Sequence, residues 1–319
     1  MVATSVLLLV FAFQTAGPIE PRTHLAASTK AEAIPRADLT VDVPLVLIPV
    51  HVTTPLGASV TTLEKPDFHV YENGVEQSIT HFSSDDAPLS VGFLFDASGS
   101  MRNKLRKSSE AAEAFFRTAN SGDEFFLIEF NERPHLAIPF TQNAQAIYRR
   151  IAHVHAEGRT SLLDAIHLAL VQMKYAKNLR KAIVIVSDGG DNRSRYTESE
   201  IKNAMREADV QVYAMGIYDP DNKPKQTPEE RNGPKLLDEL AEQTGGRHYP
   251  VKNLDDLPAV CERIGNELRN EYVIGYSPVN DAQDGTYRQV KVTVTPPPGM
   301  PELRAHNRQG YYAPALFTR

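Results

Sequence analysis

The chain has 319 residues, 41% hydrophobic and 23% charged, so it can bury a large core and has room for about two domains. Its formal net charge of −6 includes no long basic block, which argues against nucleic acid as a partner. The single cysteine, Cys261, cannot form an intramolecular disulfide, and the apolar helical pattern around it predicts a buried thiol.

The first residues have the pattern of a secretory signal. Residues 1–17 contain an apolar run at 6–13, too short to span a bilayer, followed by small residues where cleavage could occur. No basic residue precedes this run, since the first is Arg22, and no cysteine follows it to carry a lipid anchor. We expect an exported protein, periplasmic, at the cell surface or secreted, without a transmembrane span in the mature chain. Residues 18–38 are rich in Pro, Ala, Thr and charge and predict a flexible linker.

Two segments of alternating apolar and polar residues bracket the middle of the chain. Residues 39–84 predict a strand from 41 to 53 and a hairpin from 67 to 82, with its turn at Glu72-Asn-Gly74. Residues 271–314 predict three more antiparallel strands, at 271–276, 287–294 and 303–306. Each segment is too small to be stable alone, so we expect both to form one antiparallel β-sandwich into which the middle is inserted.

The middle, residues 87–270, alternates short apolar strands with helical patterns, which predicts a doubly wound α/β fold. Strands are expected at 91–96, 125–130, 136–140, 182–187 and 210–216. Helices are expected at 104–120, 142–152, 162–177, 198–208, 234–243 and 254–269. The turn at 130–134 predicts a hairpin, with one strand antiparallel at the sheet edge. The polar run 218–233 predicts an exposed, mobile loop.

Oxygen-bearing side chains gather where predicted strands end. Asp96, Ser98 and Ser100 follow the first strand, Thr160 lies just before a helix, and Asp188 follows the strand at 182–187. Because ligands bind at the carboxyl ends of parallel strands, we expect these groups at one edge of the sheet. Carboxylate and hydroxyl oxygens suit Mg²⁺, Mn²⁺ or Ca²⁺ better than zinc or copper. Each residue alone also fits a helix cap or a turn.

These motifs resemble the metal-ion-dependent adhesion site of von Willebrand factor type A domains, the fold of integrin inserted domains, over residues 87–270. In that family a D-x-S-x-S loop, a distant Thr and a later Asp hold the ion, which implies Asp96, Ser98, Ser100, Thr160 and Asp188 as ligands here. The resemblance implies a Rossmann-like fold, a Mg²⁺ ion (or Mn²⁺ or Ca²⁺), and a protein ligand whose Asp or Glu completes the metal's coordination.

The flanks carry a second, finer resemblance. Residues 63–77, 272–278 and 308–313 are similar to the segments beside type A domains in the acidobacterial type-A-related group. The resemblance to that group implies no particular biochemical activity, because none is established for the group.

Other polar residues admit plainer interpretations. Asp191 could support Asp188 or belong to an ordinary turn. His153 and His155 could form a transition-metal pair, but without a third soft ligand we expect surface histidines. The glycosylation pattern Asn192-Arg-Ser194 is discounted in a chain that looks bacterial.

Two other functions remain open. Asp96 followed by Ser98 resembles the start of haloacid-dehalogenase-like phosphatases, with Asp188 and Asp191 holding Mg²⁺, but those enzymes have a general acid where Ser98 stands. Neither a G-x-S-x-G nor an H-E-x-x-H motif is present. Type A domains also occur in intracellular assembly factors, against which the apolar start argues. We therefore expect an exported, non-enzymatic interaction module that binds a protein through a divalent cation.

Overall fold

The computed structural model describes residues 45–218 and 227–315. The expected signal segment 1–17, the linker 18–38 and residues 39–44 lie outside these ranges.

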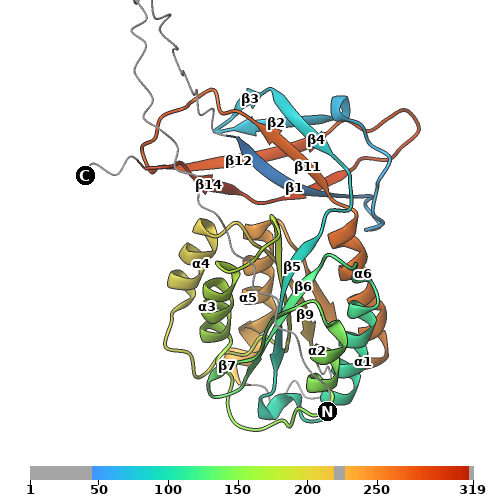
Figure 1. Ribbon diagram of the computed structural model, residues 1–319, viewed down its shortest axis with the longest axis vertical. Coiled ribbons are helices and arrows are strands. Elements are labelled where there is room, and N and C mark those ends of the chain that lie inside the picture. Colours follow the sequence, from blue (N-terminus) through green and yellow to red (C-terminus); the bar gives the residue numbers. More distant parts are fainter. Residues whose placement is uncertain (1–44, 219–226, 316–319) are drawn as a thin grey trace, which may run out of the picture. The chain divides into compact units, whose positions relative to one another are not determined.

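A six-stranded sheet forms the centre of the α/β region (Figure 1). Its strand order is β10-β9-β8-β5-β6-β7, and all neighbours are parallel except β6 and β7. The doubly wound class and the antiparallel edge strand are therefore confirmed. The strands are β5 (Leu89–Asp96), β6 (Glu124–Phe130), β7 (Pro134–Thr141), β8 (Arg180–Ser187), β9 (Gln211–Ile217) and β10 (His248–Val251).

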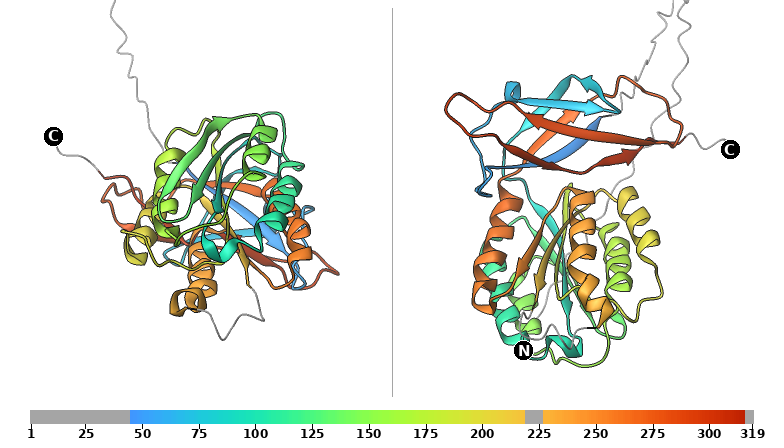
Figure 2. Two further views of the ribbon diagram at one scale, coloured as in Figure 1. Left: turned by 90° about the horizontal axis from the view of Figure 1, so that it is seen from below. Right: turned by 180° about the vertical axis from the view of Figure 1, so that it is seen from behind.

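Helices cover both faces of this sheet because its central strands are apolar on both sides. In β5, Phe93 and Phe95 join the core cluster beneath α1, α2 and α6, whereas Leu94 joins the cluster beneath α3, α4 and α5. Figures 1 and 2 show these two groups of helices on opposite sides of the sheet. The helices are α1 (Leu105–Phe116), α2 (Ala144–Ile151), α3 (Leu162–Met173), α4 (Glu198–Glu207), α5 (Pro228–Thr244) and α6 (Leu257–Arg269). Within the two described ranges, no helix is long and apolar enough to cross a membrane.

Two four-stranded antiparallel sheets form the β-sandwich, with orders β13-β1-β11-β4 and β14-β12-β2-β3. In each sheet a strand from before the α/β region pairs with one from after it, as in Ile48↔Ile274 and Val70↔Val292. Both sheets contribute to one apolar core cluster, which confirms the inserted arrangement. The strands are β1 (Val46–Thr53), β2 (Phe68–Glu72), β3 (Val75–Gln77), β4 (Ile79–Ser83), β11 (Tyr272–Tyr276), β12 (Tyr287–Val294), β13 (Arg304–Asn307) and β14 (Gly310–Tyr312).

The predicted hairpin at 67–82 is present but divided. Asn73 (φ 48°) and Gly74 (φ 81°) form the turn, which requires left-handed backbone at both positions. The second strand was expected to run without a break, but β3 pairs with β2 and β4 pairs with β11 of the other sheet. The break at Ser78 lets one segment serve both sheets, a tertiary requirement that period-two alternation does not reveal.

The expectation of an exposed loop at 218–233 is wrong for its last third. Pro228 begins α5, and Thr227 caps it, since its hydroxyl accepts from the Glu230 N–H (3.2 Å) and the Glu230 carboxylate accepts from the Thr227 N–H (3.0 Å). The polar sequence of this turn contains a capping box followed by a proline at the first helical position, and this combination marks the start of a helix rather than a loop. Residues 219–226 lie outside the described ranges.

Candidate metal centre

The first loop of the site begins at Asp96, the last residue of β5. Its carboxyl is fully buried, with Oδ1 accepting from the Ser98 N–H (2.8 Å) and Oδ2 from the Ser187 hydroxyl (2.6 Å). The short 3₁₀ turn Gly99–Met101 follows, and the fully buried Met101 anchors it. The Ser98 and Ser100 hydroxyls lie 3.1 Å apart. This loop therefore presents one carboxylate and two hydroxyls together.

Backbone hydrogen bonds join the Thr160 loop to its two neighbours. The Gly99 N–H donates to the Gly158 carbonyl (3.0 Å), and a Cβ at Gly99 would lie 3.2 Å from that oxygen. On the other side, the Thr160 N–H donates to Oδ1 of Asn192 (3.0 Å), and the Asn192 N–H donates back to the Thr160 carbonyl (3.1 Å). The three loops thus form one connected edge of the sheet, seen from below in the left view of Figure 2.

Asp188 follows β8 and brings a second buried carboxylate to this edge. Its Oδ1 accepts from the Gly190 N–H (3.3 Å), and its Oδ2 accepts from the Lys104 ammonium (3.1 Å). Burial of the Asp96 carboxyl, together with the negative charge of Asp188, raises the pKa of Asp96 from 3.8 to about 7. The two carboxylates therefore destabilise each other when both are charged.

The donor set suits a hard divalent cation. Two carboxylates and three hydroxyls offer oxygen only, which matches Mg²⁺, Mn²⁺ or Ca²⁺. Across residues 45–218 and 227–315, no group of three or more His, Cys, Asp or Glu side chains is placed to hold a metal. Hydroxyl oxygens would therefore have to complete any coordination here, and a cation would relieve the repulsion between Asp96 and Asp188.

All five residues expected from the sequence lie on the three connected loops: Asp96, Ser98, Ser100, Thr160 and Asp188. Three further residues, which the sequence patterns do not assign to the site, take part in it. Ser187 donates to Asp96, Asn192 fixes the Thr160 backbone, and Lys104 pairs with Asp188. Ser187 and Asn192 have a local signal, since both flank Asp188 in the sequence. Lys104 has none, because its partner lies far along the chain.

Asp191 has a structural role. Its Oδ2 accepts from the Leu163 N–H (2.8 Å) at the start of α3, and its Oδ1 accepts from the Ser194 N–H (3.1 Å). Among the described residues it makes no hydrogen bond to Asp188, so it caps α3 and tightens its own turn. His153 and His155 are both exposed, and Nδ1 of His153 lies 2.8 Å from the Arg149 carbonyl, which agrees with surface histidines.

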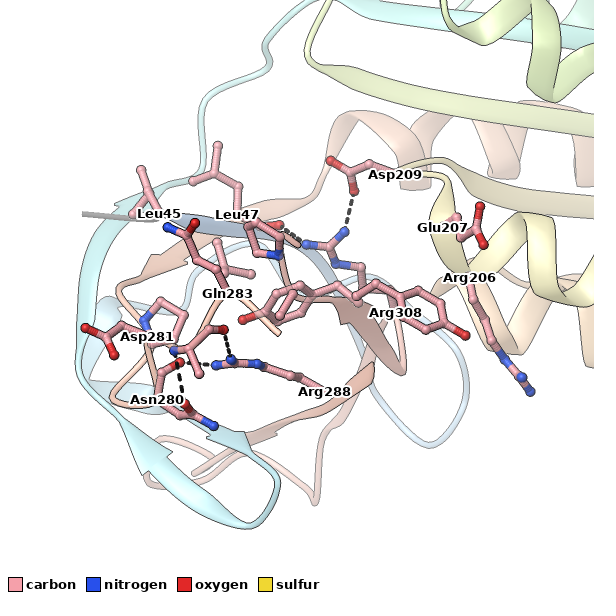
Figure 3. A pocket seen from close by; sticks show the side chains of 17 residues that line it. Leu45, Leu47, Arg206, Glu207, Asp209, Asn280, Asp281, Gln283, Arg288 and Arg308 are labelled. Atoms are coloured by element: carbon pink, nitrogen blue, oxygen red, sulfur yellow. Dashed lines mark hydrogen bonds and ion pairs between the residues drawn. The ribbon is translucent and has the colours of Figure 1, made fainter. Parts of the chain in front are cut away.

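A separate cavity of about 420 Å³ lies where the sandwich meets the end of α4 (Figure 3). Its guanidinium groups are already engaged. Arg308 donates to Asp209 (2.8 Å) and to the Leu47 carbonyl (3.0 Å), and the buried Arg288 donates to Glu72 (3.1 Å). These ion pairs hold the surrounding segments together and leave the cavity without a clear preference for anions or cations.

Comparison with known proteins finds a family match within the α/β region. Residues 91–190 match the family described as the von Willebrand factor type A domain. An uncharacterised protein of Borreliella burgdorferi is 23% identical over 168 residues, covering 48% of this chain and 49% of that protein. The chain thus spans about half the length of this relative.

Solved structures similar to this chain include two bacterial proteins. One is an aerotolerance-related membrane protein from Bacteroides fragilis, at 18% identity and TM-score 0.47, covering 56% of this chain and 98% of that one. Another is a von Willebrand factor type A protein from Catenulispora acidiphila, at 14% identity and TM-score 0.48, covering 76% and 73%. The matched segment 91–190 runs from β5 through the Thr160 loop to the Asp188 loop. This segment of the α/β region is thus similar to the von Willebrand factor type A domain.

Proposed function

We propose that this chain is a non-enzymatic interaction module that binds a protein ligand through a divalent cation. The cation, Mg²⁺ or else Mn²⁺ or Ca²⁺, is held by five residues: Asp96, Ser98, Ser100, Thr160 and Asp188. The observation that carries this proposal is a buried carboxylate pair, Asp96 and Asp188, on hydrogen-bonded loops that also carry three hydroxyls. Burying two like charges together is costly unless a cation compensates them.

A carboxylate of the partner is the group best suited to complete the coordination. Three of the five protein ligands are neutral hydroxyls, so a divalent ion keeps a strong attraction for one more anionic oxygen. Ser100 is exposed, which leaves the site open to solvent at that point. An Asp or Glu on the surface of a second protein would reach it there.

Arginines on the same loops favour an acidic partner surface. Arg102, Arg159 and Arg193 are each exposed, one on each of the three loops. In the part of the chain that the structure describes, none of the three forms an ion pair with a carboxylate. Their combined positive charge would attract an acidic surface and make association faster at low ionic strength.

Export forms part of the proposal, because residues 1–17 have the pattern of a secretory signal. A partner in the cell envelope or outside the cell is therefore expected. Recovery of the protein from the cytosol with residues 1–17 still attached would instead favour an intracellular assembly role.

One feature argues against the phosphatase alternative. The position two residues after Asp96 holds the Ser98 hydroxyl, which is a poor general acid near neutral pH. Release of phosphate from a phosphomonoester with Mg²⁺, lost in Asp96→Asn, would reverse this assignment.

The experiment that tests the proposal is capture of a partner from envelope extracts, with Mn²⁺ or with EDTA, using wild-type protein and two variants. Thr160→Ala removes one neutral ligand without changing the charge of the site. We expect it to weaken partner binding roughly ten- to a hundredfold, and to weaken Mn²⁺ binding less. Thr293→Ala, on β12 of the sandwich, is the matched control and should bind like wild type. A partner captured equally well in EDTA and by Thr160→Ala would show that recognition uses another surface.

A further inference from the structure

Lys104 is a cation built into the edge of the proposed metal site. It precedes α1 directly, and its ammonium lies 3.1 Å from Oδ2 of Asp188. The two side chains are only 12% and 7% exposed, so little water screens the pair. Across the described residues, Asp188 makes no other ion pair. One of the two carboxylates of the site is therefore neutralised by the chain itself.

The backbone holds this lysine in place. The Lys104 N–H donates to the Met101 carbonyl (2.8 Å), and its own carbonyl accepts from the N–H (2.9 Å) and the hydroxyl (3.0 Å) of Ser108. Met101 and Ser108 are both fully buried. The Lys104 side chain therefore extends from a fixed backbone position beside the D-x-S-x-S loop. A lysine on an exposed helix face would lack these contacts.

We propose that Lys104 sets the balance between cation and anion at this site: it weakens binding of the divalent ion and strengthens binding of the partner's carboxylate. This inference rests on the proposed function, since it concerns the same site. The five proposed ligands are thereby joined by Lys104, a functional residue that supplies no coordinating oxygen.

The sign of both effects follows from counting charges. With Asp96 ionised, as it is above pH 7, Asp96, Asp188 and Lys104 sum to −1, a divalent ion takes the sum to +1, and a partner carboxylate brings it to zero. Without Lys104 the same three states carry −2, zero and −1. The metal would then enter a more negative site, and the carboxylate would meet a neutral one. Charges a few ångströms apart in partly buried surroundings change such affinities by roughly three- to a hundredfold, with the larger effect on the doubly charged metal ion.

A purely structural ion pair predicts a different pattern. If Lys104 served only to hold the Asp188 loop in place, its removal would loosen the site and weaken the metal and the carboxylate together. Opposite changes in the two affinities therefore separate an electrostatic role from a structural one.

The test uses the full chain and two probes, Mn²⁺ alone and then acetate added to the Mn²⁺-loaded protein. Calorimetry gives the Mn²⁺ affinity, and the relaxation of water protons by bound Mn²⁺ reports acetate entering its coordination. Lys104→Met and Lys104→Gln both remove the charge, and the amide of Gln keeps a donor for Asp188. We expect both to bind Mn²⁺ at least about tenfold more tightly than wild type, and acetate about three- to tenfold more weakly.

Lys107→Met is the matched control. Lys107 lies one turn further along α1 and pairs with Asp255 (2.9 Å) and Glu110 (3.2 Å) rather than with the site. The Lys107→Met variant loses the same positive charge, and its affinities for Mn²⁺ and for acetate should stay within about twofold of wild type. Lys104→Arg, which preserves the charge, should stay close to wild type as well.

Three outcomes would overturn the inference. Unchanged Mn²⁺ affinity in both neutral Lys104 variants would refute it while leaving the metal site intact, and so would equal shifts in Lys107→Met. Weaker binding of both probes would assign Lys104 the structural role instead. A wild-type protein that binds no Mn²⁺ would refute the proposed function itself and this inference with it.

Discussion

Asp96→Asn should stabilise the metal-free protein while removing its cation site. Asp96 is fully buried beside Asp188, and burial together with that neighbouring charge raises its pKa from 3.8 to about 7. The folded protein therefore retains a proton at Asp96 that the unfolded chain releases near pH 4. An asparagine is neutral at every pH and avoids this cost.

The magnitude follows from the pKa difference. A carboxyl with a raised folded-state pKa contributes its full stability below about pH 4 and loses it as the pH rises toward 7. The shift from 3.8 to about 7 corresponds to at most about 4 kcal/mol above pH 7. The asparagine can still accept from the Ser98 N–H, and its amide can donate to the Ser187 hydroxyl. We therefore expect a gain on the order of 2 kcal/mol at pH 8, or a rise in Tm of about 4–8 °C.

The assay is thermal melting in excess EDTA at a series of pH values from 8 to 4. The advantage of Asp96→Asn should be largest at pH 8 and shrink toward zero near pH 4. Asp191→Asn is the control at the same edge of the sheet. Asparagine has only one accepting oxygen, so it can accept from the Leu163 N–H or from the Ser194 N–H but not from both, and this variant should melt below wild type throughout.

Two results would refute this reasoning. If Asp96→Asn melted below wild type at pH 8, the buried charge would not be the cost inferred from the structure. If its advantage were the same at every pH, the gain would have a cause other than the titration of Asp96.

Three further predictions concern the rest of the chain. Burial lowers the pKa of His51 to about 3 and of His306 to about 4, so both histidines should cost stability as the pH falls from 6.5 toward 4. In the Asp96→Asn variant, where the opposing titration of Asp96 is absent, urea unfolding should show about 2 kcal/mol lost per histidine at pH 5, and a flat profile would contradict this. Glu271→Ala removes the closer of the two carboxylates that pair with the buried Arg180 (2.9 Å, against 3.9 Å for Asp86) and should cost about 3 kcal/mol in the same assay. A loss below about 1 kcal/mol would show that this pair is dispensable. Gly245→Ala should lower Tm, because φ is 81° and a Cβ would lie 2.4 Å from the Arg308 backbone nitrogen, and an unchanged melt would mean that the segment moves freely.

The fold class and the position of the candidate site follow from local sequence patterns. All eight residues of β5 are buried, and the strand appears in the sequence as the short apolar run 91–95 followed by Asp96. The alternation of such runs with helical periodicity identifies a parallel sheet, and a parallel sheet gathers the residues that follow its strands at one edge. Sequence patterns alone therefore group the loops of Asp96, Thr160 and Asp188.

Elements with little local signal were missed or misjudged. β10 and β14 have four and three residues, too few to show a period. The first turn of α5 is polar because it faces solvent, so its composition resembles that of a loop despite the capping box that begins at Thr227.

Only the tertiary structure decided the electrostatics of the site. Lys104 and Asp188 lie 84 positions apart, and nothing around either residue indicates that they meet. The raised pKa of Asp96 likewise depends on complete burial and on the charge of Asp188, which arrives from another strand. Sequence patterns determine which residues lie at the ends of elements, because that depends on neighbours in the chain. The charge that each residue experiences depends on neighbours in space, which only the packed structure supplies.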